Sequence, residues 1–230
     1  MTDERVFLIT GASSGIGAAT ARAAHLAGGY KLVLAARSKD KLDALAEELG
    51  GPERAIAVAC DVCDFAAQEK LVARAVDAFG ALDIAWANAG FGGPRGFLKG
   101  DPDEWREMVL TNVLGAAYTV RAAIPALTKS KGHLLLTSSV AGRRAIPGSL
   151  YSCTKHAVTA MAEAARQDLN DTGIRVTSIE PGMVDTPFFD QKPTSALEPE
   201  DIARGVLYAI SQPPHVDVNE VLIRPTAQPI

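Results

Sequence analysis

Cysteines and long apolar runs are scarce in this chain. Its 230 residues include three cysteines, Cys60, Cys63 and Cys153, and an odd number without a charged-then-apolar leader favours a reducing cytoplasm. Cys60 and Cys63 are spaced like half of a zinc site, but no second cysteine or histidine pair accompanies them, so we expect no metal site. No apolar run approaches the length of a membrane span, so we expect no membrane partner.

An excess of positive charge is also missing. Lys and Arg number 23 against 27 Asp and Glu, which gives a net charge of −4, and the basic residues are scattered. This pattern predicts no nucleic-acid-binding surface. A hydrophobic content of 47% is ordinary for a globular protein, and the length fits one domain over residues 1–230.

Short runs rich in Val, Ile and Leu alternate with longer helical patterns. This alternation predicts an α/β fold, a doubly wound sheet of seven mainly parallel strands with helices on both faces. Residues 183–197, with prolines and small polar side chains, are expected to form a mobile loop. The expected strands are 5–9, 31–35, 54–60, 82–86, 132–138, 174–180 and 219–223. The expected helices are 15–27, 39–49, 65–79, 102–128, 152–171 and 199–211.

A glycine-rich turn joins the first expected strand to the first expected helix. Gly11 permits a tight turn, Gly15 lets the backbone approach a pyrophosphate, and Gly17 lets the helix pack on the strand. The start of the helix adds unpaired N–H groups and a positive dipole end. The turn therefore predicts a dinucleotide site, with the candidate contacts Gly11, Ser13, Ser14, Gly15, Ile16 and Gly17.

The end of the second expected strand bears on the choice of cofactor. Folds selective for NAD usually carry an acid about 20 residues beyond the glycines, where it hydrogen-bonds the ribose. This chain has Arg37 and Ser38 there, and Arg37 could pair with a 2′-phosphate through its planar fork. We therefore expect NADP(H) to be favoured over NAD(H), the alternative being that Arg37 is a solvated loop residue.

Three later strand ends carry further candidates for cofactor contacts. Asp61, followed by Val62, could accept from the adenine amino group or could cap the next helix, as could Asp64. Asn88 can tie neighbouring strands together. The remaining candidates are small residues or turn residues beside the expected cofactor path: Ala89, Gly90, Pro181, Gly182, Val184 and Thr186.

A hydroxyl-rich strand end and a helix start lie close together in the second half of the chain. Tyr151 and Lys155 are four residues apart, so on a helix they share one face. Ser139 adds a hydroxyl, and one small substrate could meet all three groups; the alternative is an ordinary amphipathic pair at a helix start. Asn112 is a polar residue in an otherwise apolar helical pattern, so we expect it to have a partner or a task.

Together these motifs resemble those of the single-domain short-chain dehydrogenases/reductases, over nearly the whole chain. The resemblance implies a Rossmann-type fold, with a cofactor half at about 1–130 and a catalytic and substrate half at about 131–230. It also implies a homodimer or homotetramer. Segment 218–228 is similar, more weakly, to the end of NADP-dependent serine/3-hydroxy acid dehydrogenases and clavulanate dehydrogenases.

The resemblance implies a role for each catalytic candidate. Tyr151 is the expected acid/base, and Lys155 is expected to hold the nicotinamide ribose and to lower the tyrosine pKa. Ser139 is expected to orient the substrate oxygen, and Asn112 to hold a water in a proton relay. The loop between Ser139 and Tyr151 is slightly shorter than usual in the family, so Ser138 remains an alternative to Ser139.

The expected function is that of an NADP(H)-dependent oxidoreductase, which transfers a hydride between nicotinamide and a small carbonyl compound or secondary alcohol. The alternatives are a non-catalytic NADP(H)-binding or sensing protein on the same fold, and a nucleotide-sugar epimerase or dehydratase. The substrate stays open. Arg143 and Arg144 could attract a carboxylate, whereas Met183, Phe188 and Phe189 could cover an apolar ketone.

Overall fold

Parallel strands form one sheet in the computed structural model, which describes residues 4–189 and 193–228. Within that part of the chain the sheet has seven strands in the order β3-β2-β1-β4-β5-β6-β7, and each neighbouring pair is parallel. The predicted Rossmann-type, doubly wound sheet is confirmed, and the predicted strands differ only at their ends. The strands are β1 (Arg5–Thr10), β2 (Tyr30–Ala36), β3 (Ala55–Ala59), β4 (Ile84–Ala87), β5 (His133–Thr137), β6 (Arg175–Pro181) and β7 (Glu220–Ile223).

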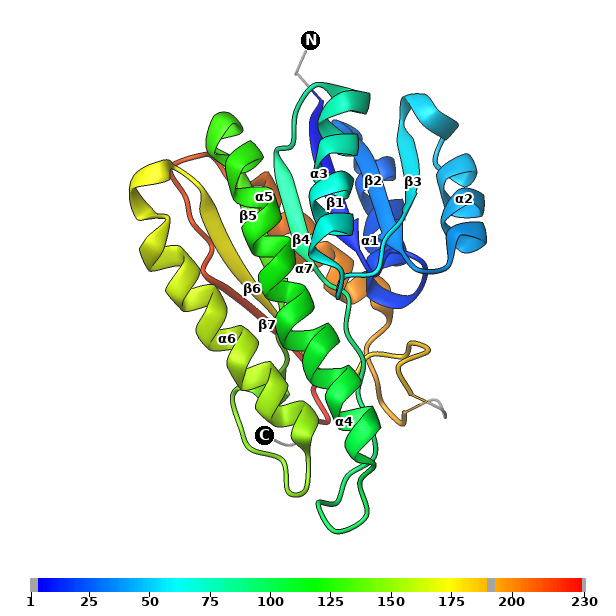
Figure 1. Cartoon of the computed structure of the whole chain (residues 1–230), viewed down its shortest axis with the longest axis vertical. Helices are drawn as coiled ribbons and strands as arrows, with labels where there is room; N and C mark the ends of the chain where they lie inside the picture. Colours follow the sequence, from blue (N-terminus) through cyan, green and yellow to red (C-terminus); the bar gives the residue numbers. More distant parts are fainter. Residues whose placement is uncertain (1–3, 190–192, 229–230) are drawn as a thin grey trace.

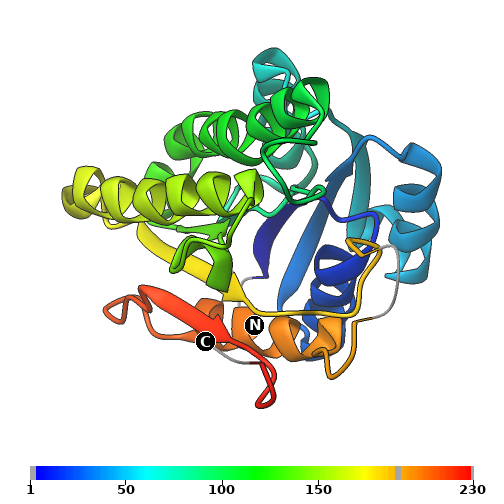
Figure 2. The same ribbon diagram turned by 90° about the horizontal axis from the view of Figure 1, so that it is seen from below.

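Helices cover both faces of the sheet. The α-helices are α1 (Gly15–Ala27), α2 (Lys39–Glu48), α3 (Phe65–Phe79), α4 (Pro102–Val109), α5 (Ala116–Ser130), α6 (Leu150–Asp168) and α7 (Pro199–Ser211). Figures 1 and 2 show α1, α2 and α7 on one face, and α3, α5 and α6 on the other. Along β1, Phe7 and Ile9 pack into one layer while Val6 and Leu8 pack into the other, because successive side chains of a strand alternate. Burial on both faces explains why the strands read as continuous apolar runs.

The carboxyl ends of the strands meet along one edge of the sheet. The strand order reverses between β1 and β4, whose following connections lead to opposite halves of the sheet. In doubly wound sheets, ligands bind in the crevice outside such a reversal. The turns after β1, β4, β5 and β6 are therefore the place where the predicted site residues should meet.

The helix predicted over 102–128 is interrupted. Between α4 and α5 lies a π-helical turn, η2 (Leu110–Gly115), which contains Asn112. Such wide turns are rare and often occur at functional sites. The polar residue that stood out in the sequence therefore marks a local departure from regular helix.

The segment 183–197, predicted to be a mobile loop, is closed at its base. Val184 and Leu197 form an isolated parallel bridge, and Asp185 N donates to Leu197 O at 2.8 Å. Residues 190–192 lie outside the described part of the chain, and mobility stays a prediction. Among the described residues, no helix is both long enough and apolar enough to span a bilayer.

Candidate active site

The glycine turn after β1 has the shape of a phosphate cradle. Gly11 and Gly15 have φ values of +67° and +53°, which other residues rarely adopt. A Cβ on Gly17 would lie 2.5 Å from Gly11 O, so only glycine lets α1 start this close to β1. Ser14 makes no side-chain capping bond, and the first turn of α1 has no acidic residue, so its N–H groups can receive an anion. The residues of the turn, Ser13 and Ile16 included, therefore fit a dinucleotide pyrophosphate.

Asn88 ties three strand ends together, as the sequence predicted. Its Nδ2 donates to Thr10 O at 2.9 Å, and Thr137 Oγ1 donates to Asn88 Oδ1 at 3.1 Å. The Asn88 backbone N also donates to Thr10 Oγ1 at 2.9 Å. These bonds join the ends of β1, β4 and β5, and so they hold the crevice together where the strand order reverses.

Small residues line the path from the glycine turn to Lys155. A Cβ on Gly11 would fall 2.9 Å from Ala89 Cα. A Cβ on Gly90 would fall 3.0 Å from Asn112 Oδ1 and 3.5 Å from Lys155 Nζ. The small residues after β4 therefore connect the phosphate cradle to the Lys155 ammonium along the carboxyl edge of the sheet.

Tyr151 and Lys155 come from the first two turns of α6. Lys155 Nζ lies 5.6 Å from the centroid of the Tyr151 ring. It donates to Thr137 O at 2.7 Å, which uses one of its three protons and holds the ammonium at the end of β5. Lys155 is only 3% exposed, so its charge lies almost wholly inside the protein.

Burial dominates the titration of both groups. It lowers the pKa of Lys155 to about 8. Burial also raises the pKa of Tyr151 to about 12, and the nearby Ser139 side chain opposes that shift. In the protein without cofactor the cost of desolvating a phenolate prevails, and the expected lowering of the tyrosine pKa by Lys155 together with oxidised nicotinamide stays a prediction. At neutral pH the Tyr151 phenol carries its proton.

Ser139, and not Ser138, faces Tyr151. The Ser138 hydroxyl lies 2.6 Å from Thr159 Oγ1, so it is committed to the interior against α6. Ser139 lies near enough to Tyr151 to lower the pKa of its phenol. Its Oγ donates to Pro181 O at 3.2 Å, which links it to the end of β6. The geometry thus agrees with the choice of Ser139, whose catalytic role stays a prediction.

The Asn112 side chain bridges the loop after β4 and the start of α6. Its Oδ1 accepts from Phe91 N at 3.0 Å, while its Nδ2 donates to Phe91 O at 2.8 Å and to Thr154 Oγ1 at 3.1 Å. Thr154 Oγ1 in turn donates to Tyr151 O at 2.8 Å. Both amide protons of Asn112 are used in this way, and its role as a water ligand stays a prediction. Thr154 was not singled out in the sequence, although it lies within one turn of Tyr151.

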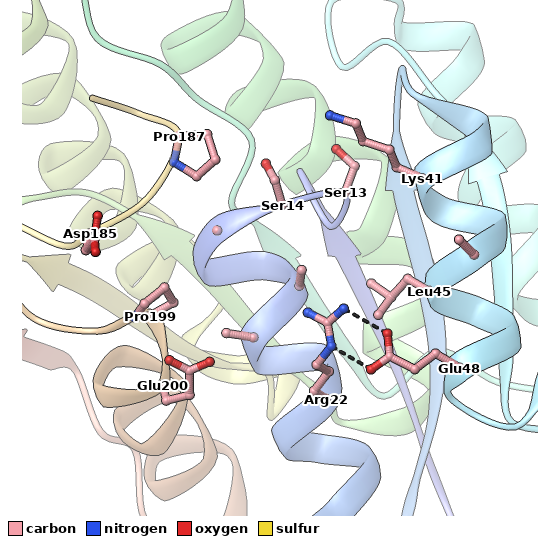
Figure 3. Close-up of a pocket in the computed structure, with 14 residues that line it drawn as sticks. Ser13, Ser14, Arg22, Lys41, Leu45, Glu48, Asp185, Pro187, Pro199 and Glu200 are labelled. Atoms are coloured by element: carbon pink, nitrogen blue, oxygen red, sulfur yellow. Dashed lines mark hydrogen bonds and ion pairs between the residues drawn. The ribbon is translucent and has the colours of Figure 1, made fainter. Parts of the chain in front are cut away.

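Lys41 lies beside the cradle, in the helix that follows Arg37 and Ser38, and the sequence reasoning missed it. Figure 3 shows Lys41 near Ser13 at the rim of a cavity of about 430 Å³ between α1 and α2. Arg37 and Lys41 are exposed, and neither forms an ion pair with any described residue. Ser38 precedes α2 without a side-chain capping bond. The available signal was the spacing, since Lys41 follows Ser38 by three residues in the first turn of α2.

The two uses foreseen for Asp61 divide between two acids. Asp64 caps α3, since its Oδ1 accepts from Ala67 N at 3.1 Å. Asp61 Oδ1 accepts from Cys63 N at 2.9 Å in the preceding turn, and the residue is exposed, while its neighbour Val62 is buried. The adenine contact of Asp61 stays a prediction.

The turn after β6 reaches back to the cradle. A Cβ on Gly15 would lie 3.2 Å from Thr186 Cγ2, so Thr186 packs directly on the glycine turn. Val184 is buried beneath it, and Gly182 N donates to Ile223 O at 2.7 Å. This arrangement agrees with the predicted position of Thr186 near the phosphates.

Phe188 brings an aromatic ring onto Tyr151. The two ring centroids are 5.3 Å apart and the rings meet edge to face. A Cβ on Gly92 would fall 2.5 Å from Phe188 Cζ, so the phenylalanine also covers the loop after β4. Phe189 meets Phe188 edge to face, with 5.0 Å between the ring centroids. The space in front of Tyr151 is therefore bounded by an apolar wall.

The Arg143 guanidinium is already paired with carboxylates of the protein. Its Nε and Nη2 donate to the two carboxylate oxygens of Glu180 at 2.6 Å and 2.8 Å. The guanidinium also pairs with Glu220, and these carboxylates raise the Arg143 pKa. Because protein acids already satisfy this arginine, the hypothesis that it attracts an anionic substrate is wrong. Among the described residues no three potential metal ligands gather, and the three cysteines are free.

Comparison with known proteins gives the class. The family model for short chain dehydrogenases matches residues 5–196, and the chain belongs to this family of oxidoreductases. A Staphylococcus aureus protein named as an uncharacterized oxidoreductase is 40% identical over 227 residues, which cover 96% of this chain and 97% of that protein.

Solved structures agree in fold. An alcohol dehydrogenase from the archaeon Thermococcus sibiricus, complexed with 5-hydroxy-NADP, is 33% identical with a TM-score of 0.91 and covers 98% of each chain. A serine dehydrogenase complexed with NADP⁺ is 30% identical with a TM-score of 0.89, over 98% of this chain and 96% of that one. Another similar structure, a short chain dehydrogenase/reductase from Burkholderia phymatum, is in complex with NAD instead.

Proposed function

We propose that the protein is an NADP(H)-dependent carbonyl reductase or alcohol dehydrogenase that acts on a small carbonyl compound or secondary alcohol. The observation that carries this proposal is the run of small residues that leads from the Gly11 cradle, past Gly90, to the buried Lys155 ammonium beside Tyr151. A dinucleotide that follows this run would reach from phosphate-binding N–H groups to a proton donor. The bound cofactor supplies the hydride and, when oxidised, positive charge near the phenol.

The side chains around the reacting carbon then have distinct tasks. Tyr151 is protonated at neutral pH, because its pKa is about 12, and it can give its proton to the carbonyl oxygen in the direction of reduction. When substrate is bound, the Ser139 hydroxyl turns its single proton from Pro181 O to the charge that develops on that oxygen. Lys155 holds the cofactor ribose, and its ammonium favours the phenolate that remains after the transfer. Asn112 orders the start of α6 through Thr154.

The groups beside the cradle support NADP(H) over NAD(H). Arg37 and Ser38 stand at the end of β2, where an acid would favour NAD, and Lys41 lines the cavity beside the cradle, so two cations and a hydroxyl could receive a 2′-phosphate. The two named structural neighbours that carry NADP-type cofactors add support. We expect Asp61 and Val62 to contact the adenine, and the turn after β6 to face the nicotinamide carboxamide with Thr186 near the phosphates.

Three broader expectations complete the proposal. We expect residues 1–130 to bind most of the cofactor and residues 131–230 to supply most of the catalytic and substrate groups. We expect a cytoplasmic homodimer or homotetramer. We expect small-molecule substrates, since the family acts on them and the apolar wall at Phe188 leaves limited room before Tyr151.

The test is oxidation of NADPH with a panel of ketones, aldehydes and keto acids, and reduction of NADP⁺ with alcohols and 3-hydroxy acids. Tyr151→Phe is expected to lower kcat at least about 10²-fold while the affinity for NADPH is retained, because the phenyl ring keeps the packing but has no proton to give. Tyr118→Phe is the matched control and should keep full activity, because the Tyr118 ring packs at a tilt against Phe65 and not against Tyr151. A Tyr151→Phe enzyme with most of its kcat would refute the assignment.

A further inference from the structure

The short turn that carries Ser139 is attached to the end of β6 at both of its ends. The turn is η3 (Val140–Gly142), which Ser139 precedes and Arg143 follows. At the first end, Ser139 Oγ donates to Pro181 O at 3.2 Å. At the other end, Arg143 donates two parallel hydrogen bonds of 2.6 Å and 2.8 Å to the carboxylate of Glu180, the residue before Pro181. The turn is therefore fastened to two consecutive residues of one strand.

The remaining side of the turn has no room to shift. Gly142 is buried, and a Cβ there would fall 2.4 Å from Ser138 Oγ and 2.6 Å from Thr159 Oγ1. Packing against α6 thus limits movement in one direction, while the Arg143 bonds limit movement in the other. Inside η3 itself, Gly142 N donates to Ser139 O at 2.8 Å, so a displacement of Arg143 is passed on to Ser139.

The Arg143 partner is an unusual choice for a merely structural pair. Glu180 is 0% exposed, and Ser178 Oγ donates to its Oε1 at 2.9 Å. Only the glutamate side of the pair is buried, since the Arg143 side chain is 36% exposed. Burying the Glu180 carboxylate is costly, so the pair is weak evidence for stability. Its bidentate geometry, in contrast, sets direction as well as distance.

We propose that the Arg143–Glu180 pair is a positioning device, which holds η3 against the end of β6 and so sets where the Ser139 hydroxyl points relative to Tyr151. The proposal rests on the proposed function, because it assumes that Ser139 contacts the substrate oxygen. Arg143 itself contacts no substrate and acts through Ser139. Since small errors in the placement of a reacting group can cost up to about 10²-fold in rate, loss of this hold should be visible in kcat.

The test is a double-mutant cycle between Arg143→Met and Ser139→Ala, read in kcat and KM for the best substrate of the panel. Arg143→Met keeps the apolar stem but removes the fork, and it is expected to lower kcat about 10- to 100-fold with little change in the KM for NADPH. In the Ser139→Ala background the same change is expected to cost less than about twofold, because the residue it positions is gone. Arg143→Lys keeps the charge without the fork and should give an intermediate kcat.

A control and a second variant keep the test decisive. Arg54→Met removes another arginine that ends a 3₁₀ turn and pairs with a glutamate, but at the opposite end of the strands, and it should leave kcat unchanged. If Arg143→Met unfolds because Glu180 is left charged and unpaired, the double variant Arg143→Met with Glu180→Gln removes that charge. This double variant should show the same loss of kcat.

An equal loss of kcat from Arg143→Met in both backgrounds, or no loss in either, would overturn the proposal. A crystal structure of Arg143→Met tests the position of Ser139 directly, without an activity measurement. We expect Ser139 Oγ to move away from Pro181 O, and an unchanged position would also count against the proposal. Absence of NADPH turnover by the wild-type protein with every carbonyl compound would instead reject the proposed function, while that crystal structure would still decide the positioning.

Discussion

Protonation of His133 should destabilise the fold in mild acid. This residue begins β5 and is 1% exposed. Its Nε2 lies 2.7 Å from Thr177 Oγ1, and since that hydroxyl donates to Val218 O at 2.6 Å, the imidazole must be the donor. The other ring nitrogen, Nδ1, is buried without a hydrogen-bond partner among the described residues. A second proton would therefore create a buried, unpaired cation.

The magnitude follows from the shifted titration. Burial, and then the charges of Arg175 and Arg5, lower the pKa of His133 to about 3 from its ordinary 6.5. Because the folded pKa is the lower one, the unfolded chain binds the proton first, and stability is lost as the pH falls below 6.5. At pH 4.5, about 2 units below the unfolded pKa, the loss is about 2.7 kcal/mol, at about 1.4 kcal/mol per unit.

The assay is urea unfolding of the wild type and of His133→Gln at pH 7.5 and pH 4.5, at one protein concentration. The wild type should lose about 2.7 kcal/mol more than the variant between the two pH values, since glutamine keeps a donor but does not titrate. His215→Gln removes an exposed histidine and should not change the difference beyond about 0.5 kcal/mol. A difference below about 1 kcal/mol between wild type and His133→Gln would show that the imidazole is not held neutral.

Two further predictions concern substrate and cofactor choice. Phe188→Ala removes the ring that meets Tyr151 edge to face. An aryl ketone bound in front of Tyr151 would lose an aromatic contact of about 0.5–1.5 kcal/mol, so its KM should rise about 3- to 10-fold. An unchanged KM would show that substrate does not touch this wall. Arg37→Glu should raise the KM for NADPH about 10- to 100-fold and leave that for NADH nearly unchanged, because a charged hydrogen bond to the 2′-phosphate is lost. An equal loss with both cofactors would place Arg37 elsewhere.

The parts of the fold that depend on local sequence were predictable. Strand positions follow from apolar runs, and the cradle follows from glycines at positions with positive φ, Gly11 and Gly15. The π-helical turn was not predictable, since it accompanies a contact between Asn112 and the distant backbone of Phe91. The pairing of Arg143 with Glu180 could not be predicted for the same reason, because Glu180 lies 37 residues further along the chain.

The pKa values of the central pair could not be predicted from the sequence either, and they bear on the direction of the reaction. A tyrosine and a lysine one turn apart suggest an acidified phenol, but burial raises the pKa of Tyr151 to about 12 and lowers that of Lys155 to about 8. The protein alone therefore keeps the phenol protonated, and it lets the Lys155 ammonium lose its proton at a pH only slightly above neutral. A donor that already carries its proton suits reduction of a carbonyl, whereas oxidation of an alcohol needs the phenolate. That phenolate needs additional positive charge, and of the groups in the proposed mechanism only the oxidised cofactor adds it. We therefore expect the proton state of Tyr151 to follow the redox state of the cofactor.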